Sequence, residues 1–399
     1  MTTLLKGKTV VLGVTGSIAA YKAADLASKL MQAGARVDVV LTPAAAEFVP
    51  PLTFRGVTQG TVIVDMWAAA EEHIELARRA DIVVVAPATA TTIARLAQGL
   101  AEDMVSLTVL ATRAPVLVCP AMDNQMFENA ATQANLETLR SRGVTIVGPD
   151  EGRLATGRMG LGRLSDTETI LGAIRYLLGR GGDLAGRKVV VTAGGTREPI
   201  DPVRYVGNYS SGKMGYALAE AARDRGAEVA LVSAPTALPT PFGVRLVAVG
   251  RAVEMRDAVV HECRGAEVLV MAAAVADYQP PATAGQKIKR RAATLTLELE
   301  RTPDILAEAG EGFLKVGFAA ESEDLLANAR RKLEAKGLDL IVANDITAAG
   351  SGFGAETNRV VIIDRKGGEE RLPLLTKYEV AQRLWDRVVP LLPRRRRRR

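Results

Sequence analysis

The chain has 399 residues, 48% of them hydrophobic and only 4% aromatic, which is typical of parallel sheets covered by helices in two or three domains. Its formal charge of +6 is that of the six C-terminal arginines, since the other basic residues balance the 45 acidic ones. This charge pattern argues against nucleic-acid binding. The sequence has no long apolar run and no signal-peptide pattern, which argues against a membrane or secreted protein, and no paired cysteines or clustered histidines, which argues against a zinc protein. We therefore expect a cytoplasmic protein.

The first half of the chain predicts alternating strands and helices. Lys8 to Val14 and Val37 to Leu41 are apolar runs typical of buried strands, with an amphipathic helix between them. A dinucleotide site would need a GxGxxG turn and an acidic residue after the second strand. The chain instead has Gly16 and Ser17 in the turn and Thr42 after the strand, which disfavours a nicotinamide-dependent reductase. Hydroxyl groups suit a terminal phosphate, so the pattern favours flavin mononucleotide (FMN).

Later strands bring more hydroxyl groups to the same predicted edge. Asp81 to Ala86 runs into the turn PATA, so Thr89, and Ser106 further on, are candidates to line a ligand crevice. An ordinary strand-to-helix turn explains the same pattern. Val116 to Cys119 and Val144 to Val147 predict two further strands, and the glycine-rich run EGRLATGRMGLGRL that follows predicts a flap.

His73 is the only histidine of the first half, and it stands near the start of the predicted helix HIELARRA. A lone histidine in such a place is a surface or capping residue more often than a catalyst. Any imidazole general base in this half must nevertheless be His73.

A glycine-rich, charged segment, GRGGDLAGRK, separates two regions of apolar periodicity, as a linker does. LKGKTVVLGVTGS near the start is similar to LAGRKVVVTAGGT after this segment, so each half begins with a strand, a turn of small residues and a helix. We therefore predict an α/β protein with two Rossmann-like or flavodoxin-like parallel-sheet domains in tandem. The predicted boundaries are 1–178 for the first domain, 179–187 for the linker, 188–392 for the second domain and 393–399 for a basic tail.

The stretch TAGGTREPIDPVRYVGNYSSGKMG carries most information in the second half. It follows the predicted strand Lys188 to Val191, so Gly194 reaches the edge of a sheet while residues 210–212 offer hydroxyl and N–H groups before a helix. This arrangement predicts a phosphate site. The spacing GxxxxGK is almost a P-loop, but Met214 stands where Ser or Thr would bind magnesium. A surface turn with Ser211 as a helix cap is the alternative interpretation.

Two charged features follow further along the chain. Val268 to Val270 predicts a strand that leads to Asp277, a position that suits magnesium or nucleotide binding as well as a helix cap. Lys287 and Lys289 point the same way on an extended segment, although a solvated charged face has that pattern too.

The last candidates are an aromatic residue and two lysines. Pro303 to Leu306 predicts a helix start, and Phe318 follows an apolar run, where its ring could stack on a base. Lys332 and Lys336 are four residues apart, so a helix presents both on one side. Each feature also has an ordinary surface or core explanation.

These motifs carry a resemblance to known enzymes. GVTGSIAAYKAADL, His73 with its helix, PATA, PAM and GPDEG resemble the flavin-dependent cysteine decarboxylases. TAGGTREPIDPVR, NYSSGKMG, AAAVADY, KIK, PDIL and GFAAE resemble phosphopantothenate-cysteine ligase. In this order they resemble the family of bifunctional phosphopantothenoylcysteine decarboxylase and phosphopantothenate-cysteine ligases of coenzyme A biosynthesis, over nearly the whole chain before the arginine tail.

The resemblance implies two linked reactions. In the ligase reaction, the carboxylate of 4'-phosphopantothenate would react with CTP in the presence of Mg2+, giving an acyl-cytidylate and pyrophosphate. The amine of cysteine would then attack the acyl-cytidylate. The decarboxylase would then convert phosphopantothenoylcysteine to 4'-phosphopantetheine with FMN. The family also implies a homo-oligomer with trimeric decarboxylase and dimeric ligase contacts, which a dodecamer would satisfy, and no nucleic-acid or membrane partner.

The resemblance assigns roles residue by residue. Catalytic roles fall on His73, Asp123, Thr156, Asn208 and Lys287. Flavin-binding positions are Gly16, Ser17, Ile18, Thr42, Thr89 and Ser106. Nucleotide-binding positions are Ser211, Gly212, Ala273, Asp277, Lys287, Pro303, Asp304, Ile305, Leu306, Phe318, Lys332 and Lys336, with Asp277 also on the metal. Substrate-binding positions are Arg204, Asn208 and Ala274.

Two positions of the decarboxylase half depart from the family pattern. Asp123 stands where the family has asparagine, and Thr156 stands where it has a flap cysteine. The alternative hypothesis is therefore an active ligase fused to a flavoprotein that does not decarboxylate. We predict that decarboxylation proceeds with His73 as base and that the later reduction is slow.

Overall fold

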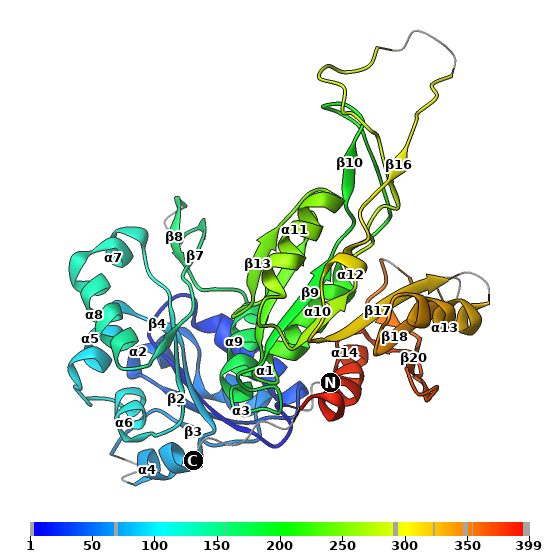
Figure 1. Cartoon of the computed structure of the whole chain (residues 1–399). Helices are drawn as coiled ribbons and strands as arrows, with labels where there is room; N and C mark the ends of the chain where they lie inside the picture. Colours follow the sequence, from blue (N-terminus) through cyan, green and yellow to red (C-terminus); the bar gives the residue numbers. More distant parts are fainter. Residues whose placement is uncertain are drawn as a thin grey trace. The chain divides into compact units, whose positions relative to one another are not determined.

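The chain folds into two compact units, Met1–Gly179 and Arg180–Arg399, in a computed structural model (Figure 1). The structure describes residues 4–67, 71–155, 157–289, 294–321, 324–345, 350–352 and 354–393. Each unit holds its own parallel sheet and its own helices. Across these described ranges, no helix combines the length and the apolarity needed to span a membrane.

A six-stranded sheet forms the centre of the first unit, with the strand order β3-β2-β1-β4-β5-β6 and parallel pairing throughout. Its strands are β1 (Thr9–Val14), β2 (Arg36–Leu41), β3 (Val62–Ile63), β4 (Ile82–Ala88), β5 (Val116–Pro120) and β6 (Thr145–Ile146). This is the order of the Rossmann fold, in which a ligand crevice opens where the order reverses, here between β1 and β4. The predicted α/β class is confirmed.

Helices cover this sheet through the apolar faces that the sequence predicts. In α1, Ala23, Leu26, Ala27 and Leu30 recur at helical spacing and are all buried. The helices are α1 (Ala20–Gln32), α2 (Pro43–Phe48), α3 (Pro51–Val57), α4 (Glu72–Arg79), α5 (Ala90–Gln98), α6 (Met104–Ala111), α7 (Asn124–Glu128), α8 (Ala130–Ser141) and α9 (Thr167–Gly179). An antiparallel hairpin forms from the glycine-rich run, with strands β7 (Asp150–Arg153) and β8 (Met159–Arg163).

An eight-stranded sheet forms the centre of the second unit, in the order β13-β12-β9-β14-β17-β18-β20-β21. Its first six strands pair in parallel, and β20 and β21 add an antiparallel edge. The strands are β9 (Lys188–Ala193), β12 (Glu228–Ser233), β13 (Arg245–Ala248), β14 (Val268–Met271), β17 (Leu314–Glu321), β18 (Leu340–Asp345), β20 (Val360–Asp364) and β21 (Glu369–Arg371). The order reverses between β9 and β14, so a second crevice opens after TAGGT.

Successive side chains of β9 point to opposite faces of the sheet and pack against two layers of helices. The helices of this unit are α10 (Lys213–Arg223), α11 (Ala252–Glu262), α12 (Ile305–Glu308), α13 (Leu325–Ala335), α14 (Lys377–Val388) and the short η1 (Val389–Leu391). Val189 and Val191 pack in one core cluster with α10 and α14, whereas Val190 packs in another with α11, α12 and α13. The sheet is therefore covered on both faces, which explains why its strands are continuously apolar.

An arm projects from the second sheet and contains two antiparallel ribbons (Figure 1). The ribbons pair β10 (Arg197–Pro199) with β11 (Tyr205–Gly207), and β15 (Tyr278–Gln279) with β16 (Glu300–Arg301). A further short pair, β19 (Thr357–Asn358) with β22 (Leu375–Thr376), precedes α14.

Much of the predicted linker is packed against the second unit. Leu184 is fully buried in the core of that unit. Asp183 pairs with Arg225, and Arg187 pairs with Glu267. Residues 183–187 are thus anchored, and the apolar Leu184 within a glycine-rich run is the sequence signal for it.

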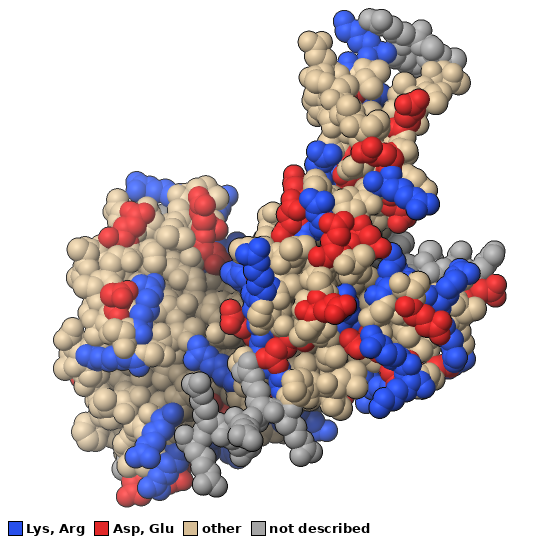
Figure 2. All heavy atoms as spheres, in the orientation of Figure 1, with Lys and Arg blue, Asp and Glu red and all other residues tan. Residues whose placement is uncertain are grey.

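Charged side chains of both signs are mixed on the face shown in Figure 2. Figure 2 shows lysines and arginines interspersed with aspartates and glutamates over both units. This distribution agrees with the balance of basic and acidic residues outside the C-terminal arginines.

Candidate active sites

A buried threonine joins the two loops at the crevice of the first unit. The hydroxyl of Thr15, just after β1, donates to the carbonyl of Pro87 at 2.8 Å and accepts from the N–H of Thr89 at 3.0 Å. Thr15 is fully buried, so these bonds are costly to lose. Gly16 is required beside it, because a Cβ atom there would lie 2.6 Å from the Cβ of Ala44. The GVTGS turn is thereby fixed against β4 and α2.

A cavity of 730 Å³ opens beside this turn. Its walls come from the start of α1, the loop after β5 and the β7–β8 hairpin, and they include Ser17, Ile18, Met122, Asp123, Leu154 and Gly162. The N–H of Met122 donates to the carbonyl of Gly162 at 3.0 Å, so the hairpin packs directly on the PAMD loop. A mainly apolar cavity with a few polar groups suits a small cofactor such as a flavin.

Buried threonines also join the two loops at the crevice of the second unit. The hydroxyl of Thr192, at the end of β9, accepts from the N–H groups of Ala272 and Ala273, each at 3.1 Å. The hydroxyl of Thr196 accepts from the N–H of Ala276 at 2.9 Å. Both threonines are fully buried, so the loop after β14 is held to the loop after β9 without any ligand.

Two glycines allow the backbone of this crevice to approach closely. A Cβ atom on Gly195 would lie 2.6 Å from the carbonyl oxygen of Asn208. Gly212 has a φ of 75°, and a Cβ atom there would lie 2.5 Å from Cγ2 of Thr236. Gly212 precedes the first residue of α10, so the free N–H groups of that helix begin at the crevice.

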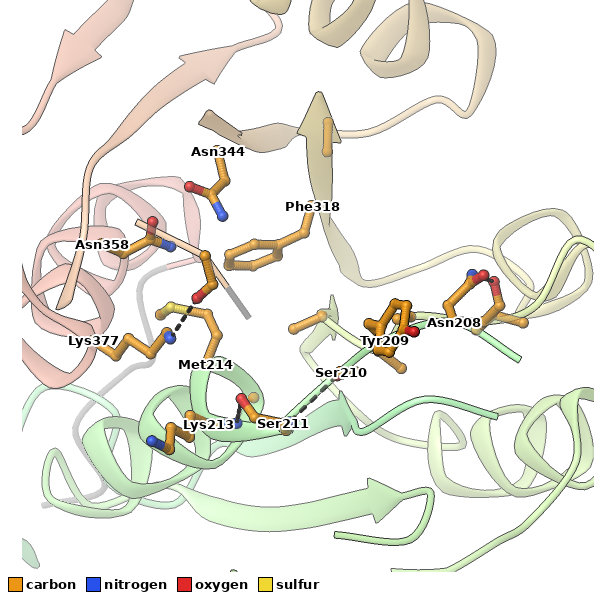
Figure 3. A pocket seen from close by; sticks show the side chains of 18 of the residues that line it. Asn208, Tyr209, Ser210, Ser211, Lys213, Met214, Phe318, Asn344, Asn358 and Lys377 are labelled. Carbon is orange, nitrogen blue, oxygen red and sulfur yellow. Dashed lines mark hydrogen bonds between the residues drawn. The ribbon is translucent and has the colours of Figure 1, made fainter. Parts of the chain in front are cut away.

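A cavity of 490 Å³ lies over the start of α10. It is lined by the loops 208–215 and 272–277 and by single residues from later elements, among them Phe318, Lys332, Asn344, Asn358 and Lys377. Figure 3 shows the Phe318 ring facing the open space with Asn344, Asn358 and Lys377, while Asn208 and Tyr209 lie on the other side. The Nδ2 group of Asn208 donates to the carbonyl of Val275 at 2.9 Å, which orients the amide.

A second cavity, of 630 Å³, adjoins the first and shares Asp277, Phe318 and Lys332 with it. Lys336 pairs with Asp304, which caps α12, and the Nζ of Lys332 donates to the carbonyl of Phe318 at 2.8 Å. Burial raises the pKa of Asp304, but the hydrogen bond and the charge of Lys336 outweigh it, so the pKa is lowered. Asp304 is therefore an ionised partner for Lys336.

Asp277 is the carboxylate that both cavities of the second unit share. Within the described part of the chain, no three His, Cys, Asp or Glu side chains gather to hold a metal. Mg2+ commonly takes one or two protein carboxylates and completes its shell with substrate phosphates and water. Asp277 therefore fits Mg2+ that arrives with a nucleotide.

Comparisons with known proteins match both units. Residues 1–179 match the family described as Flavoprotein, and residues 184–391 match the DNA/pantothenate metabolism flavoprotein C-terminal domain. The chain is 44% identical over 398 residues to the coenzyme A biosynthesis bifunctional protein CoaBC of Bacillus subtilis (strain 168), covering 97% of this chain and 98% of the relative. The CoaBC protein of Escherichia coli (strain K12) is 46% identical over 398 residues, covering 96% and 97%. The chain belongs to the CoaBC family.

This CoaBC-family chain is a bifunctional enzyme of coenzyme A biosynthesis, with a flavoprotein decarboxylase half and a ligase half. Among solved structures, the chain is similar to the C-terminal domain of CoaBC, with 41% identity, coverage of 53% of this chain and 97% of that chain, and a TM-score of 0.46. It is also similar to the FMN-dependent cysteine decarboxylase SpaF, with 28% identity, coverage of 44% and 97%, and a TM-score of 0.39.

The flavoprotein half of this CoaBC-family chain brings three predicted positions into one cavity. Ser17, Ile18 and Asp123 line the 730 Å³ cavity, and Gly16 adjoins it in the turn. The predicted flap position Thr156 lies outside the described residues.

Other predicted positions of this half do not line that cavity. Thr42 and Thr89 cap α2 and α5, where their hydroxyls accept backbone N–H groups three residues on. Ser106 is 1% exposed and exchanges hydrogen bonds with Asp103 in a capping box. His73 lies half-buried in the first turn of α4. The three hydroxyls thus have partners within the protein, a structural role that was not expected from the sequence for Thr42 or Ser106.

The predicted ligase positions fall mainly into the two adjoining cavities. The 490 Å³ cavity contains Asn208, Ser211, Gly212, Ala273, Ala274, Asp277, Phe318 and Lys332. The 630 Å³ cavity contains Ala273, Asp277, Pro303, Asp304, Ile305, Leu306, Phe318, Lys332 and Lys336.

Arg204 and Lys287 line neither cavity and lie on the arm. Arg204 pairs with Asp201 and donates to the carbonyl of Ile288 at 2.9 Å. The hydrogen bond from Arg204 is the main reason that the pKa of Asp201 lies well below its usual value. Lys287 is exposed and precedes Ile288, whose N–H donates to Asp201 at 3.1 Å.

The lining of the 490 Å³ cavity includes side chains that were not predicted from the sequence, among them the polar Asn344, Asn358 and Lys377. Asn344 stands near the end of β18, and its Oδ1 atom is buried without a hydrogen-bond partner among the described residues. The run VAND was the available signal, because a polar residue at the carboxyl end of a buried strand is placed at the ligand edge. The capping box TKYE predicts that a helix starts at Lys377, but it does not predict that this helix start lies at the cavity.

Proposed function

We propose that the ligase half joins 4'-phosphopantothenate to cysteine with CTP and Mg2+, and that the flavoprotein half uses FMN to convert the product to 4'-phosphopantetheine. The observation that carries the ligase assignment is the 490 Å³ cavity, where an oriented amide, Asn208, lies in the same cavity as Phe318 and a helix start. The flavin assignment is supported by the Flavoprotein match and by the cavity beside GVTGS.

The ligase reaction needs a carboxylate to become a good acyl donor. A carboxylate oxygen of 4'-phosphopantothenate would attack the α-phosphorus of CTP, and pyrophosphate would leave. The amine of cysteine would then attack the acyl carbon, and CMP would leave as the amide forms and a proton is lost. Bound Mg2+ would neutralise phosphate charge, with Asp277 as its protein ligand.

Asn208 is the residue we assign to the acyl group. An amide has two N–H donors, and the bond to Val275 uses one of them. The other can donate to the oxyanion that develops on the acyl carbon, where one such donor contributes about 3–4 kcal/mol in known enzymes. Phe318 suits the flat face of a nucleobase, and Lys332 and Lys336 suit the phosphates.

Arg204 and Lys287 remain predictions that the resemblance supplies. Both lie on the arm, so a single chain gives them no place in either cavity. The predicted homo-oligomer offers one way to bring them to a site, from the arm of a second chain. A cytoplasmic location also remains a prediction.

The flavoprotein half must handle a substrate that carries both a thiol and a carboxylate. FMN, when bound, supplies the two-electron oxidation and reduction that the conversion needs. Ser17 and Ile18 would hold it in the 730 Å³ cavity, and Asp123 faces the same space. We keep His73 as the predicted proton acceptor, although it does not line this cavity within one chain.

A second candidate function follows from Asp123. Its side chain caps α7 by accepting the N–H of Gln125 at 3.0 Å, and as a carboxylate it would repel the carboxylate of the substrate. A flavoprotein that binds FMN without decarboxylating, fused to an active ligase, is the resulting alternative.

One experiment separates these functions. The purified chain receives 4'-phosphopantothenate, cysteine, CTP and Mg2+, and the products are weighed by mass spectrometry. We expect CMP, pyrophosphate and 4'-phosphopantetheine. Accumulation of phosphopantothenoylcysteine alone supports the second candidate, and the absence of any amide product contradicts both.

A further inference from the structure

Two lysines stand at the starts of two helices on the wall of the 490 Å³ cavity. Lys213 is the first residue of α10 and Lys377 is the first residue of α14, and both line the cavity. Neither has a role in the proposed ligase chemistry so far. Two positively charged side chains on one wall indicate that this part of the cavity binds an anionic group.

A buried framework fixes these two helices against each other. Tyr378 donates its hydroxyl to Asp224 at 2.7 Å, and Asp224 pairs with the fully buried Arg223 at the end of α10. Trp385 of α14, also fully buried, donates to the carbonyl of Leu218 in α10 at 3.1 Å. The positions of the two helix starts are therefore set by the core and do not depend on a ligand.

The positive charges of Lys213 and Lys377 are only partly balanced by nearby carboxylates. Lys377 is only 6% exposed, and its described partners are carbonyl oxygens, those of Gly352 at 3.1 Å and of Ala355. Burial, the largest cause, and the charge of Lys213 lower the pKa of Lys377, and the opposing charge of Glu356 does not outweigh them. A buried ammonium group is costly unless an anion accompanies it. Dipolar carbonyls satisfy its hydrogen bonds, and the carboxylate that acts on it, Glu356, is exposed and already paired with Lys213.

Lys213 has a carboxylate partner that can leave easily. Its Nζ donates to the carbonyl of Gly354 at 2.9 Å and pairs with Glu356. The side chain of Glu356 is 82% exposed, so releasing it to water costs little. A bound anion can thus replace Glu356 at Lys213 without leaving a buried charge behind.

The same wall offers further groups for an anion. The first turns of α10 and α14 carry a partial positive charge. In α10 they add N–H groups without helical partners, whereas the N–H groups of Lys377 and Glu379 in α14 already donate to the carbonyl of Glu356 and the hydroxyl of Thr376. Ser210 and Ser211 add hydroxyl groups just before Gly212, the N-cap of α10. Among the residues that line the cavity, Asp277 is the acidic one, against three lysines, Lys213, Lys332 and Lys377. The cavity is therefore strongly suited to a multiply charged phosphate.

We infer that Lys213 and Lys377 form a phosphate-binding pair that holds the terminal phosphates of the nucleotide. The inference rests on the proposed ligase function and adds to it the residues that recognise the triphosphate tail. Two lysines and two helix starts match a triphosphate, which carries about four negative charges, better than the roughly two charges of a phosphate monoester. The tail, rather than the phosphate of 4'-phosphopantothenate, is thus the better occupant. Held there, it leaves as pyrophosphate when the first phosphorus is attacked near Asn208.

The test uses the full chain with its flavin and compares CTP with CMP by calorimetry. Lys213→Met and Lys377→Met are the test variants, since methionine keeps the apolar stem and removes the charge. Lys366→Met, at an exposed turn after β20 outside the described cavities, is the matched control. We expect each test variant to weaken CTP binding about tenfold or more and to leave CMP binding nearly unchanged, because only CTP has terminal phosphates.

Glu356→Gln should change the affinity for CTP in the opposite direction. It removes the carboxylate that competes for Lys213, so CTP should bind more tightly than to the parent chain, with CMP unaffected. Weaker CTP binding in this variant would contradict the exchange at Lys213.

Several results would overturn the inference. Equal losses for CMP and CTP would place the lysines elsewhere on the nucleotide, and a higher KM for 4'-phosphopantothenate with unchanged CTP binding would assign them to that substrate. If Lys377→Met fails to fold, as its thermal unfolding would show, Lys213→Met decides with the same readout. A parent chain that makes no amide product refutes the proposed ligase, yet a selective loss of CTP over CMP binding would still support the pair.

Discussion

The hydroxyl of Thr192 accepts a hydrogen bond from the N–H group of Ala273 at 3.1 Å, across the point where the strand order of the second sheet reverses. Thr15 makes the equivalent link in the first sheet, by bonding to Pro87 and Thr89. Both units thus use a buried threonine at the carboxyl end of the first strand, Thr15 just after β1 and Thr192 within β9, to hold the facing loop. The two crevices are preorganised by the fold itself, as precise sites require.

Thr192→Val should destabilise the second unit and weaken nucleotide binding. Valine has nearly the same shape but leaves the N–H groups of Ala272 and Ala273 without their acceptor. We expect a loss of about 1–3 kcal/mol in unfolding free energy, with a higher KM for CTP. Thr192→Ser keeps the hydroxyl and is the control. Equal stability of the valine and serine variants, measured by urea unfolding, would show that the link is unimportant.

Gly195→Ala should impair the ligase while sparing the flavoprotein half. The new Cβ atom would lie 2.6 Å from the backbone oxygen of Asn208, so the loop that carries the amide must shift. Gly181→Ala is a matched control, because no atom of the described residues lies within 4 Å of a Cβ atom there. We expect kcat/KM for amide formation to fall roughly tenfold or more, as small misplacements near a reacting group do. An unaltered rate would mean that the loop tolerates the shift.

Much of the fold was predictable because its elements have strong local patterns. The strand at Lys188, the turn of small residues and the helix at Lys213 all appear as predicted, since a buried strand and an amphipathic helix have distinct periods. Ser106 shows the limit of this reasoning. A hydroxyl side chain suits both a ligand and a helix cap, and Asp103 three residues earlier was the sign that favoured the cap.

The composition of the ligase cavity was harder to predict. Asn344, Asn358 and Lys377 come from β18 of the second sheet, from the separate β19–β22 pair and from α14, and their meeting depends on how these elements are ordered in space. No local pattern encodes that order. For the arm, a shared motif suggested a proximity that the structure does not have. Arg204 is close to Asn208 in sequence, yet its side chain is held on the arm by Asp201.

The contact between Asp201 and Arg204 should make one part of the arm sensitive to acid. The hydrogen bond from Arg204 lowers the pKa of Asp201 in the folded chain, so the contact is complete above the ordinary aspartate pKa and is lost as pH falls through the lower, folded value. Hydrogen exchange at the Ile288 amide, which donates to Asp201, is the measurement. We expect protection from neutral to mildly acidic pH and its loss only in stronger acid.

Asp201→Asn should remove that protection at neutral pH, because the charge that holds Arg204 is gone. Glu300→Gln is the matched control on the same arm, since glutamine can keep a hydrogen bond to Gln279. Protection of Ile288 that is equal in both variants would show that the ribbon pairing, and not Asp201, orders this segment.

Asn208→Asp should slow amide formation more than nucleotide activation. A carboxylate repels both the developing oxyanion and the carbonyl of Val275, which the amide now contacts at 2.9 Å. Loss of one oxyanion donor lowers rates by about a hundredfold or more. Pyrophosphate release and amide product, measured in single-turnover experiments, should therefore separate. Asn328→Asp, on α13 outside the described cavities, is the control, and an equal effect on both steps would contradict a role at the acyl group.

Asp123→Asn should speed the decarboxylase half. Asp123 lines the 730 Å³ cavity, and its Oδ1 atom accepts the N–H of Gln125, an acceptor role that an asparagine oxygen can keep. The substitution replaces a negative charge with an N–H donor toward the substrate carboxylate, and a charge-assisted hydrogen bond contributes about 1.5–3 kcal/mol. We expect roughly tenfold or more faster release of carbon dioxide from phosphopantothenoylcysteine.

The control for this prediction is Asp166→Asn, which removes another carboxylate from the same cavity, one that is already paired with Arg163. Because that charge is neutralised by its partner, its loss should change carbon dioxide release little. If both variants accelerate the reaction alike, general electrostatics of the cavity is responsible rather than a contact at Asp123. If Asp123→Asn slows the reaction, the carboxylate itself takes part, and the departure from the family asparagine is a functional substitution.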